Sequence, residues 1–196
     1  TTLAKADDVV TLTLTASEAI ATPVVTFQSG GAAITDPSVT YTNTSGNTWT
    51  AVYTANASDT SGAVSYSIAF SDTAGNAGTA VTSGSGSVTF DTTAPTLSSV
   101  SIASNNSTTT LAKADDVVTL TLTASEAIAT PVVTFKSGGD AITDTSITYA
   151  NSGNVHTAKY TVDTDDTAGS VTYSIAFADT AGNAGTAVTS GSGSVT

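Results

Sequence analysis

The sequence contains no cysteine, no methionine and no arginine, and its four lysines stand against sixteen acidic residues. Without cysteine the chain can form no disulfide and can perform no thiol chemistry. The net charge of −12 repels phosphate backbones, so we expect no nucleic-acid partner and an affinity for divalent cations instead. No apolar run approaches the length of a membrane span, and we therefore expect no direct membrane insertion.

The chain does have an internal repeat of whole-domain length. Residues 1–27 recur letter for letter as residues 109–135, and residues 66–89 recur as residues 173–196 with Ser71 replaced by Ala178. An offset of about 107 residues suits complete domains rather than solenoid units that need neighbours to bury a core. We predict one unit over residues 1–90 and a second over residues 91–196, which opens with the linker Asp91–Pro95.

Short segments rich in Val, Ile, Thr, Tyr and Phe alternate with Gly, Asn, Asp and Ser, which is typical of an all-β sandwich. Helical periodicity is missing. The strands expected in the second unit are 97–103, 117–124, 131–136, 147–150, 155–162, 170–178 and 184–196.

The segment 91–107 has no counterpart ahead of Thr1, so we expect the first unit to lack its first strand. Alternation along the strands predicts which core residues that strand covers. The expected contact joins Leu97, Val100 and Ile102 to Val118, Leu120 and Leu122, whereas Val10, Leu12 and Leu14 of unit one stay uncovered. Two explanations remain open: the sequence is a window on a longer array, or the unit borrows a strand from a neighbour.

No catalytic constellation emerges from the sequence. The one histidine, His156, occupies the position of Trp49 in the other unit, so a Ser/His pair would exist in only one of two near-copies. His156 also has no second histidine or cysteine at a spacing that would bind zinc. We therefore expect core packing for both residues and no enzyme activity.

Acidic residues in loops give the best chemical signal. In a sandwich, the loops at Glu126 and at Asp179–Asn183 share one pole with the linker residue Asp91, and hard oxygen ligands of this kind suit Ca²⁺. Asp7 and Asp8 of unit one are expected to help. The alternative is that Asp and Asn stand in turns because turns favour them.

Unit one carries its own version of this set, Glu18, Asp72 and Asn76, without a linker acid. A second acidic cluster, Asp163, Asp165 and Asp166, departs from the EF-hand spacing and is a weaker candidate.

The linker motif DTTAP at Asp91–Pro95, the repeated LAKADDVVTLTLTASEAI and the loop DTAGN at 179–183 and 72–76 resemble the bacterial immunoglobulin-like repeats of giant surface adhesins and other extracellular repeat proteins. The resemblance covers essentially the whole chain, although Lys113–Asp116 lacks the glycine usual in the first turn. It implies two tandem immunoglobulin-like β-sandwich domains, an extracellular or cell-surface location, and stiffening by calcium between domains.

Two functions compete. The first is a structural spacer of an adhesin or surface filament, whose partners are further copies of the same repeat in cis or end to end. The second is a binding module that recognises a glycan or a partner protein, which predicts a cluster of exposed aromatic residues. Most of the six tyrosines, five phenylalanines and one tryptophan fall on expected buried faces, so the sequence favours the spacer.

Overall fold

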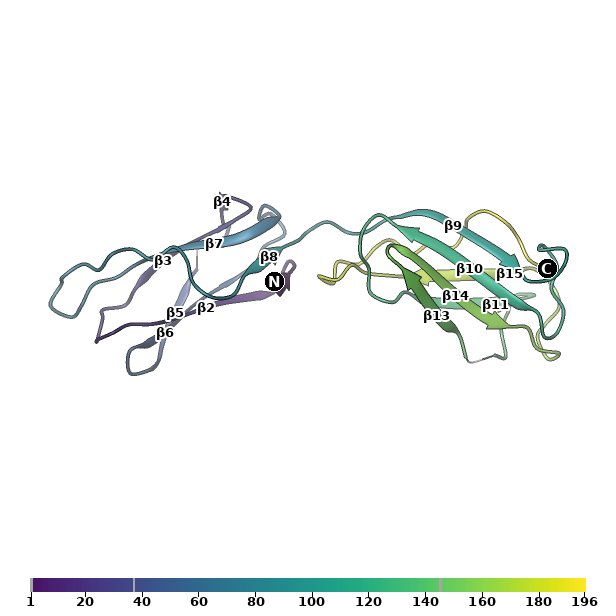
Figure 1. The fold of residues 1–196 in the computed structure, drawn as a ribbon, viewed down its shortest axis with the longest axis horizontal. Coiled ribbons are helices and arrows are strands. Elements are labelled where there is room, and N and C mark those ends of the chain that lie inside the picture. Colours follow the sequence, from purple (N-terminus) through teal and green to yellow (C-terminus); the bar gives the residue numbers. More distant parts are fainter. Residues whose placement is uncertain (1, 37, 145) are drawn as a thin grey trace. The chain divides into compact units, whose positions relative to one another are not determined.

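A computed structural model describes residues 2–36, 38–144 and 146–196, and in these ranges the chain forms β-strands and no helix (Figure 1). Accordingly, no helix in the described residues is long and apolar enough to cross a membrane. The chain divides into two compact units, Thr1–Thr93 and Ala94–Thr196. The division falls inside the linker, shortly after the boundary expected from the repeat.

The second unit consists of two antiparallel sheets. The first has the order β13-β14-β10-β9. Its strands are β9 (Leu97–Ser104), β10 (Val117–Ala124), β13 (Thr148–Ser152) and β14 (Val155–Thr161). The second has the order β12-β11-β15. Its strands are β11 (Val132–Ser137), β12 (Asp140–Ala141) and β15 (Val171–Ala176).

One core lies between these sheets. Along β10 the side chains of Val118, Leu120 and Leu122 are 0% exposed, and the threonines between them face the other way, as the alternation predicts. The ring centroids of Phe135 and Tyr160, from opposite sheets, lie 4.8 Å apart at an interplanar angle of 44°. Two sheets packed face to face around a shared core form an immunoglobulin-like β-sandwich.

The first unit repeats this plan with one sheet of order β1-β8-β7-β3-β4 and another of order β2-β6-β5. The strands of the first are β1 (Thr2–Ala4), β3 (Val24–Ser29), β4 (Ala32–Ala33), β7 (Gly62–Ala69) and β8 (Val88–Phe90). Those of the second are β2 (Val9–Thr15), β5 (Thr40–Ser45) and β6 (Thr48–Thr54). The aromatic pair recurs as Phe27 and Tyr53, 4.7 Å apart.

The prediction of a continuous strand over residues 184–196 is wrong. The segment touches the sheets only through isolated bridges at Ala184, Val188 and Ser192 and through backbone hydrogen bonds near its end. Closely spaced glycines explain the interruption, because Gly193 has a φ of +77°, a conformation that a regular strand does not contain.

Sequence reasoning also missed a short parallel pairing that the repeated segment TTLA makes in each unit. In unit one, β1 runs parallel to β8, with Thr2, Leu3 and Ala4 opposite Val88, Thr89 and Phe90. In unit two, the amide of Ala112 donates to the carbonyl of Thr196 at 3.0 Å, and the amide of Thr196 donates to the carbonyl of Thr110 at 2.9 Å. These segments are too short to show a periodicity in the sequence.

Candidate functional site

The two acidic loops predicted to converge do so in unit two. Glu126 follows β10, Asp179 follows β15, and a β-bridge between Ile128 and Asp179 holds the loops side by side. One carboxylate oxygen of Glu126 lies within 4.8 Å of one of Asp179. The same pole receives the linker, because the amide of Ser125 donates to the carbonyl of Thr96 at 2.8 Å.

Asp179 is the organising residue of its own loop and is only 3% exposed. Its Oδ1 accepts hydrogen bonds from the amides of Gly182 and Asn183 at 2.6 and 2.8 Å, and its Oδ2 accepts one from the Asn183 side-chain amide at 2.8 Å. This is the Asp-centred turn that the alternative interpretation expected. Turn chemistry therefore accounts for the DTAGN motif by itself, and any cation would share Asp179 with this turn.

The spacing of Glu126 and Asp179 is compatible with a shared calcium ion. Calcium–oxygen distances of about 2.3–2.6 Å allow two ligand oxygens on the same ion to lie up to about 5 Å apart. The 4.8 Å limit satisfies that condition. Two carboxylates supply only part of the six to eight oxygens that calcium takes, so further protein groups or water would have to complete the shell.

Asp91 lies just beyond β8, at the end of unit one. Its amide donates to the carbonyl of Ala4 at 2.8 Å, which extends the parallel β1–β8 pairing by one bond. Its Oδ1 accepts a hydrogen bond from the amide of Thr93 at 2.9 Å and so fixes the first turn of the linker. Asp91 is therefore the last residue of unit one that is held against β1.

Asp7 and Asp8 form the turn after β1, where Asp7 has a φ of +71°. Asp8 is not an unpaired ligand, because its carboxylate accepts the Lys5 amide at 2.9 Å and the Lys5 ammonium at 3.4 Å. These contacts, the backbone hydrogen bond first, lower the pKa of Asp8. The turn explains both acids without a cation, and Lys5 already offsets the charge of Asp8.

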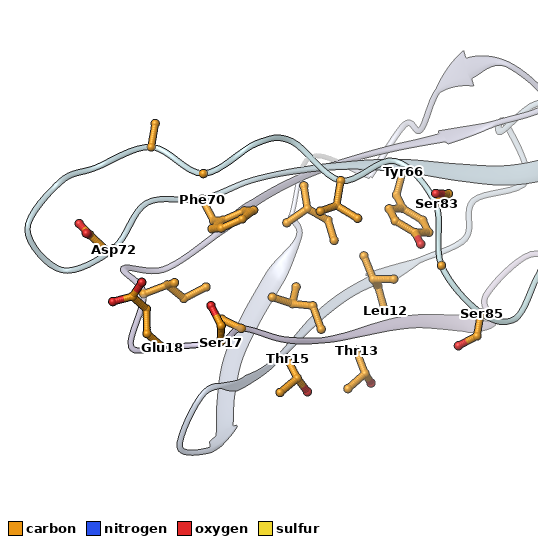
Figure 2. Close-up of a pocket in the computed structure, with 18 of the residues that line it drawn as sticks. Leu12, Thr13, Thr15, Ser17, Glu18, Tyr66, Phe70, Asp72, Ser83 and Ser85 are labelled. Carbon is orange, nitrogen blue, oxygen red and sulfur yellow. The ribbon is translucent and has the colours of Figure 1, made fainter.

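The set of unit one partly copies the acidic loops of unit two. Asp72 accepts the side-chain amide of Asn76 at 2.7 Å and its backbone amide at 2.8 Å, and these bonds lower the pKa of Asp72. Asp72 also bridges to Ile20, as Asp179 does to Ile128. Glu18 is exposed, and it stands with Asp72 at one end of a groove (Figure 2).

This groove of unit one has a volume of about 560 Å³. Figure 2 shows Leu12, Tyr66 and Phe70 pointing into it, while Thr13 and Thr15 point away. Its lining is mainly apolar along β2 and β7 and polar at Ser83 and Ser85 on the far side. The sequence analysis expected an uncovered strip here: Leu12 and Leu14 are half-buried in agreement with it, but Val10 is only 7% exposed and lies in the core, so that part of the prediction is wrong.

Two further acids, Asp59 and Asp166, have a structural role that the sequence analysis did not assign. Oδ1 of Asp166 accepts the amide and the hydroxyl of Thr143 at 2.8 and 3.0 Å, and Oδ2 accepts the Asp163 amide at 3.0 Å. Asp59 makes the same contacts with Thr35 and Asn56. The acidic cluster at 163–166 is therefore a loop clamp. Its only signal in the sequence is that an Asp and a Thr recur at the same positions in both units.

Exposed aromatic residues are few in the described part of the chain. Among its large apolar side chains that are well exposed, Tyr149 is the one aromatic residue, at 38%. Its hydroxyl accepts the Val133 amide at 3.1 Å, so it ties the two sheets of unit two together. His156 is 5% exposed and Trp49 is half-buried, which agrees with packing roles for both.

Comparison with known proteins gives likeness to solved structures alone. No protein-family model and no curated protein matches the chain. The I-band fragment I67–I69 of titin is 16% identical over 96% of this chain, with a TM-score of 0.42, and this chain spans 59% of that fragment. The N-terminal eight Ig domains of Down Syndrome Cell Adhesion Molecule are 16% identical over 97% of this chain and 26% of that one, with a TM-score of 0.35.

These structures are tandems of immunoglobulin domains, and this chain has the same kind of fold. The assignment rests on the strand order and the shared core of each unit, and no residue role is transferred from the matches.

Proposed function

We propose that the chain is a load-bearing spacer of an extracellular repeat protein, such as a bacterial surface adhesin or a secreted filament. The observation that carries the proposal is a parallel pairing near the end of each unit: β1 pairs with β8 in unit one, and residues 110–112, which follow β9, pair with Thr196 in unit two. A spacer transmits tension through its two ends, so the contact that holds the last segment of each unit decides how well the unit resists.

Parallel neighbours at the two ends of a unit are suited to this task. Force that pulls the start of β1 and the end of β8 apart slides one strand along the other. The hydrogen bonds between them, including those from Thr2 to Ser87 and from Asp91 to Ala4, are then loaded together rather than one by one. Because the same pairing occurs in both units, they form successive links of one tether, whose partners are further copies of the same repeat.

We propose calcium as a second stiffening element at the linker. Glu126 and Asp179 supply the nearest pair of carboxylates, Asn183 adds an amide, and Asp91 is joined to this pole through a linker of few residues. The equivalent set, Glu18, Asp72 and Asn76, is proposed for the linker of a preceding repeat. A net charge of −12 supports attraction of a cation, and it also supports a role away from nucleic acid.

The tensile role is tested by pulling single molecules of the full chain from both ends. Ala112→Pro removes the amide that donates to Thr196, so we expect the second unit to unfold at a lower force while the first is unchanged. Ala112→Ser keeps the donor and serves as the control. Equal unfolding forces for the proline and serine variants would contradict the role of the terminal pairing.

The calcium proposal is tested separately by titration calorimetry and by melting in calcium or chelator. Binding to the folded state alone should raise the unfolding temperature. Glu126→Gln should abolish the shift, whereas Asp163→Asn, in the loop clamp, should leave it intact. A chain that gives no heat with calcium and the same melt in chelator would overturn the calcium proposal without touching the tensile one.

A further inference from the structure

The groove of unit one occupies the place that β9 fills in unit two. In unit two, β10 pairs on one side with β14 and on the other with β9, with Leu120 opposite Ile102 and Leu122 opposite Val100. The strand β2 of unit one has the same sequence as residues 117–123 of β10. Among the residues that the structure describes, β2 pairs with β6 and has no strand on its outer edge.

The floor of the groove is a core surface without its cover. Leu120 and Leu122, with β9 beside them in the same sheet, are 0% exposed, whereas their counterparts Leu12 and Leu14 are only half-buried. The same holds for Phe70, which is half-buried where Phe177 is 7% exposed. Because these residues are identical, the difference comes from what surrounds them, and β9 is the neighbour that unit one lacks among its described residues. An apolar strip beside an open strand edge is a surface that proteins normally cover.

The far side of the groove presents a second set of backbone groups. In unit two, the amide of Ile102 donates to the carbonyl of Ser192 at 3.0 Å, and the amide of Ser192 donates to the carbonyl of Val100 at 2.8 Å. Ser85 is the counterpart of Ser192 and lines the groove. A strand in the groove would thus find hydrogen-bonding edges on both sides, as β9 does.

The glycines of this far side keep the space clear. In unit two, Gly191 and Gly193 pack directly against the carbonyl groups of Val100 and Ile102, so that no side chain fits between. In unit one, Gly86 has the same left-handed conformation, with a φ of +82°, but a Cβ there would meet nothing within 4 Å. Gly86 therefore keeps the backbone conformation that Gly193 has beside β9, although no described residue lies next to it.

We propose that this groove is a strand-acceptor site, and that its occupant is an extended, uncharged strand of the β9 type. The pattern it must match is that of Leu97–Ser104, with apolar residues at alternate positions opposite Leu14 and Leu12 and small polar residues between. Main-chain hydrogen bonds to β2 and Ser85 hold the strand, and the apolar pockets select its side chains.

The connection seen in unit two shows how a strand of the β9 type reaches this place. There β9 ends at Ser104, and the segment 105–108 leads straight to Thr109, which begins the exact copy of the start of unit one. The same short connection ahead of β1 would bring a strand to the groove. A second copy of the chain is a poorer source, because its β9 already covers its own β10. An uncharged strand also meets no repulsion from this acidic chain.

The experiment adds a copy of Thr96–Thr108 ahead of the full chain. Trp49, the only tryptophan, lies in unit one, so its fluorescence follows the unfolding of that unit. We expect the Trp49 transition to move to higher denaturant and the outward-facing amides of β2 to exchange at least about tenfold more slowly. The matched control carries Val100→Asp and Ile102→Asp in the added copy only.

Three outcomes would overturn the proposal. The added segment could behave like its Asp control, which would mean that the groove does not accept the strand. Ser85→Pro, which removes the amide of the far edge, could leave the gain from the extension intact. Finally, the chain without extension could associate with itself in sedimentation experiments and protect β2, which would make a second copy the occupant. None of these results depends on the tensile role or on calcium.

Discussion

The two units share most of their sequence, yet identical residues are buried to different extents in each. In unit two β9 covers β10, and Tyr173 is buried strongly enough that burial raises the pKa of its hydroxyl. In unit one the corresponding Tyr66 is half-buried and lines an open groove. The comparison teaches that burial is a property of the assembly of strands, so one sequence can be a core surface or an accessible one.

The largest expected difference concerns the leucines under the missing strand. Leu120→Ala should destabilise unit two by about 2–5 kcal/mol, because it removes a fully buried side chain and leaves a cavity. Leu12→Ala should cost unit one only about 1 kcal/mol, since that side chain is already partly in water. Denaturant unfolding, with Trp49 reporting unit one and circular dichroism reporting both units, measures the two effects. Equal losses would mean that the groove is closed in solution.

A second comparison uses two glycines with the same backbone conformation. Gly193→Ala and Gly86→Ala both force a left-handed residue and should each cost about 1 kcal/mol. Gly193→Ala should cost about 1–3 kcal/mol more, because its Cβ collides with the carbonyl of Ile102. The same unfolding assay tests this. If Gly86→Ala proved as damaging as Gly193→Ala, something would already lie beside Gly86.

The acidic clamps should behave alike in both units, which makes them an internal control. Asp59→Ala and Asp166→Ala should each cost about 1–3 kcal/mol, because three donors lose a shared acceptor. The control variants Asp7→Ala and Asp115→Ala change turn acids of the two units at matching positions outside the clamps. A clear difference between the two clamp variants would show that the units are not equivalent outside the groove.

The clamps also predict a pH dependence. Burial raises the pKa of Asp59 and Asp166, but hydrogen bonds from Asn56 and Thr35, or from Asp163 and Thr143, outweigh it and hold both below the ordinary 3.8. The unfolded chain therefore binds protons more readily than the folded one. The contribution is complete above the unfolded value and is lost as pH falls through the lower folded value. The measurement follows the free energy of unfolding from about pH 6 to about pH 2. The native chain should lose stability over this range, and the alanine variants should lose less.

The smallest effect is expected from the two buried tyrosine hydroxyls. Those of Tyr53 and Tyr160 have no hydrogen-bond partner among the described residues, and burial, with the nearby Asp59 or Asp166 charge, raises each pKa to about 12. Tyr53→Phe and Tyr160→Phe should leave stability unchanged or raise it by up to about 1 kcal/mol. A loss of more than about 1 kcal/mol in either melt would reveal a partner for the hydroxyl.

Much of the fold could be predicted because the alternation of β10 and β15 states which side is buried. The predicted strand 117–124 matches β10, and the expected cover of Leu120 and Leu122 by Ile102 and Val100 is confirmed. The prediction failed at 184–196, where glycines interrupt the strand, and at β1 and residues 110–112, where the pairing partner lies most of a domain away.

The candidate sites were harder to predict for a physical reason. The convergence of Glu126 and Asp179 followed from loop topology and is confirmed. The hydrogen bonds that make Asp179 and Asp166 centres of turns and clamps depend on backbone amides, which every residue but proline has. The uncovered strip of the groove could be predicted only by comparing the two repeats, because Leu12 and Leu120 stand in identical sequence contexts and differ in what lies beside them.

The most direct test of the account is amide hydrogen exchange along β2 and β10 in the unmodified, monomeric chain. An antiparallel strand with one neighbour bonds alternate amides only, whereas a strand with two neighbours bonds them all. We predict slow exchange at every amide in the middle of β10 and an alternation of slow and fast amides along β2. Uniformly slow exchange along β2, matching β10, would contradict an open strand-acceptor groove.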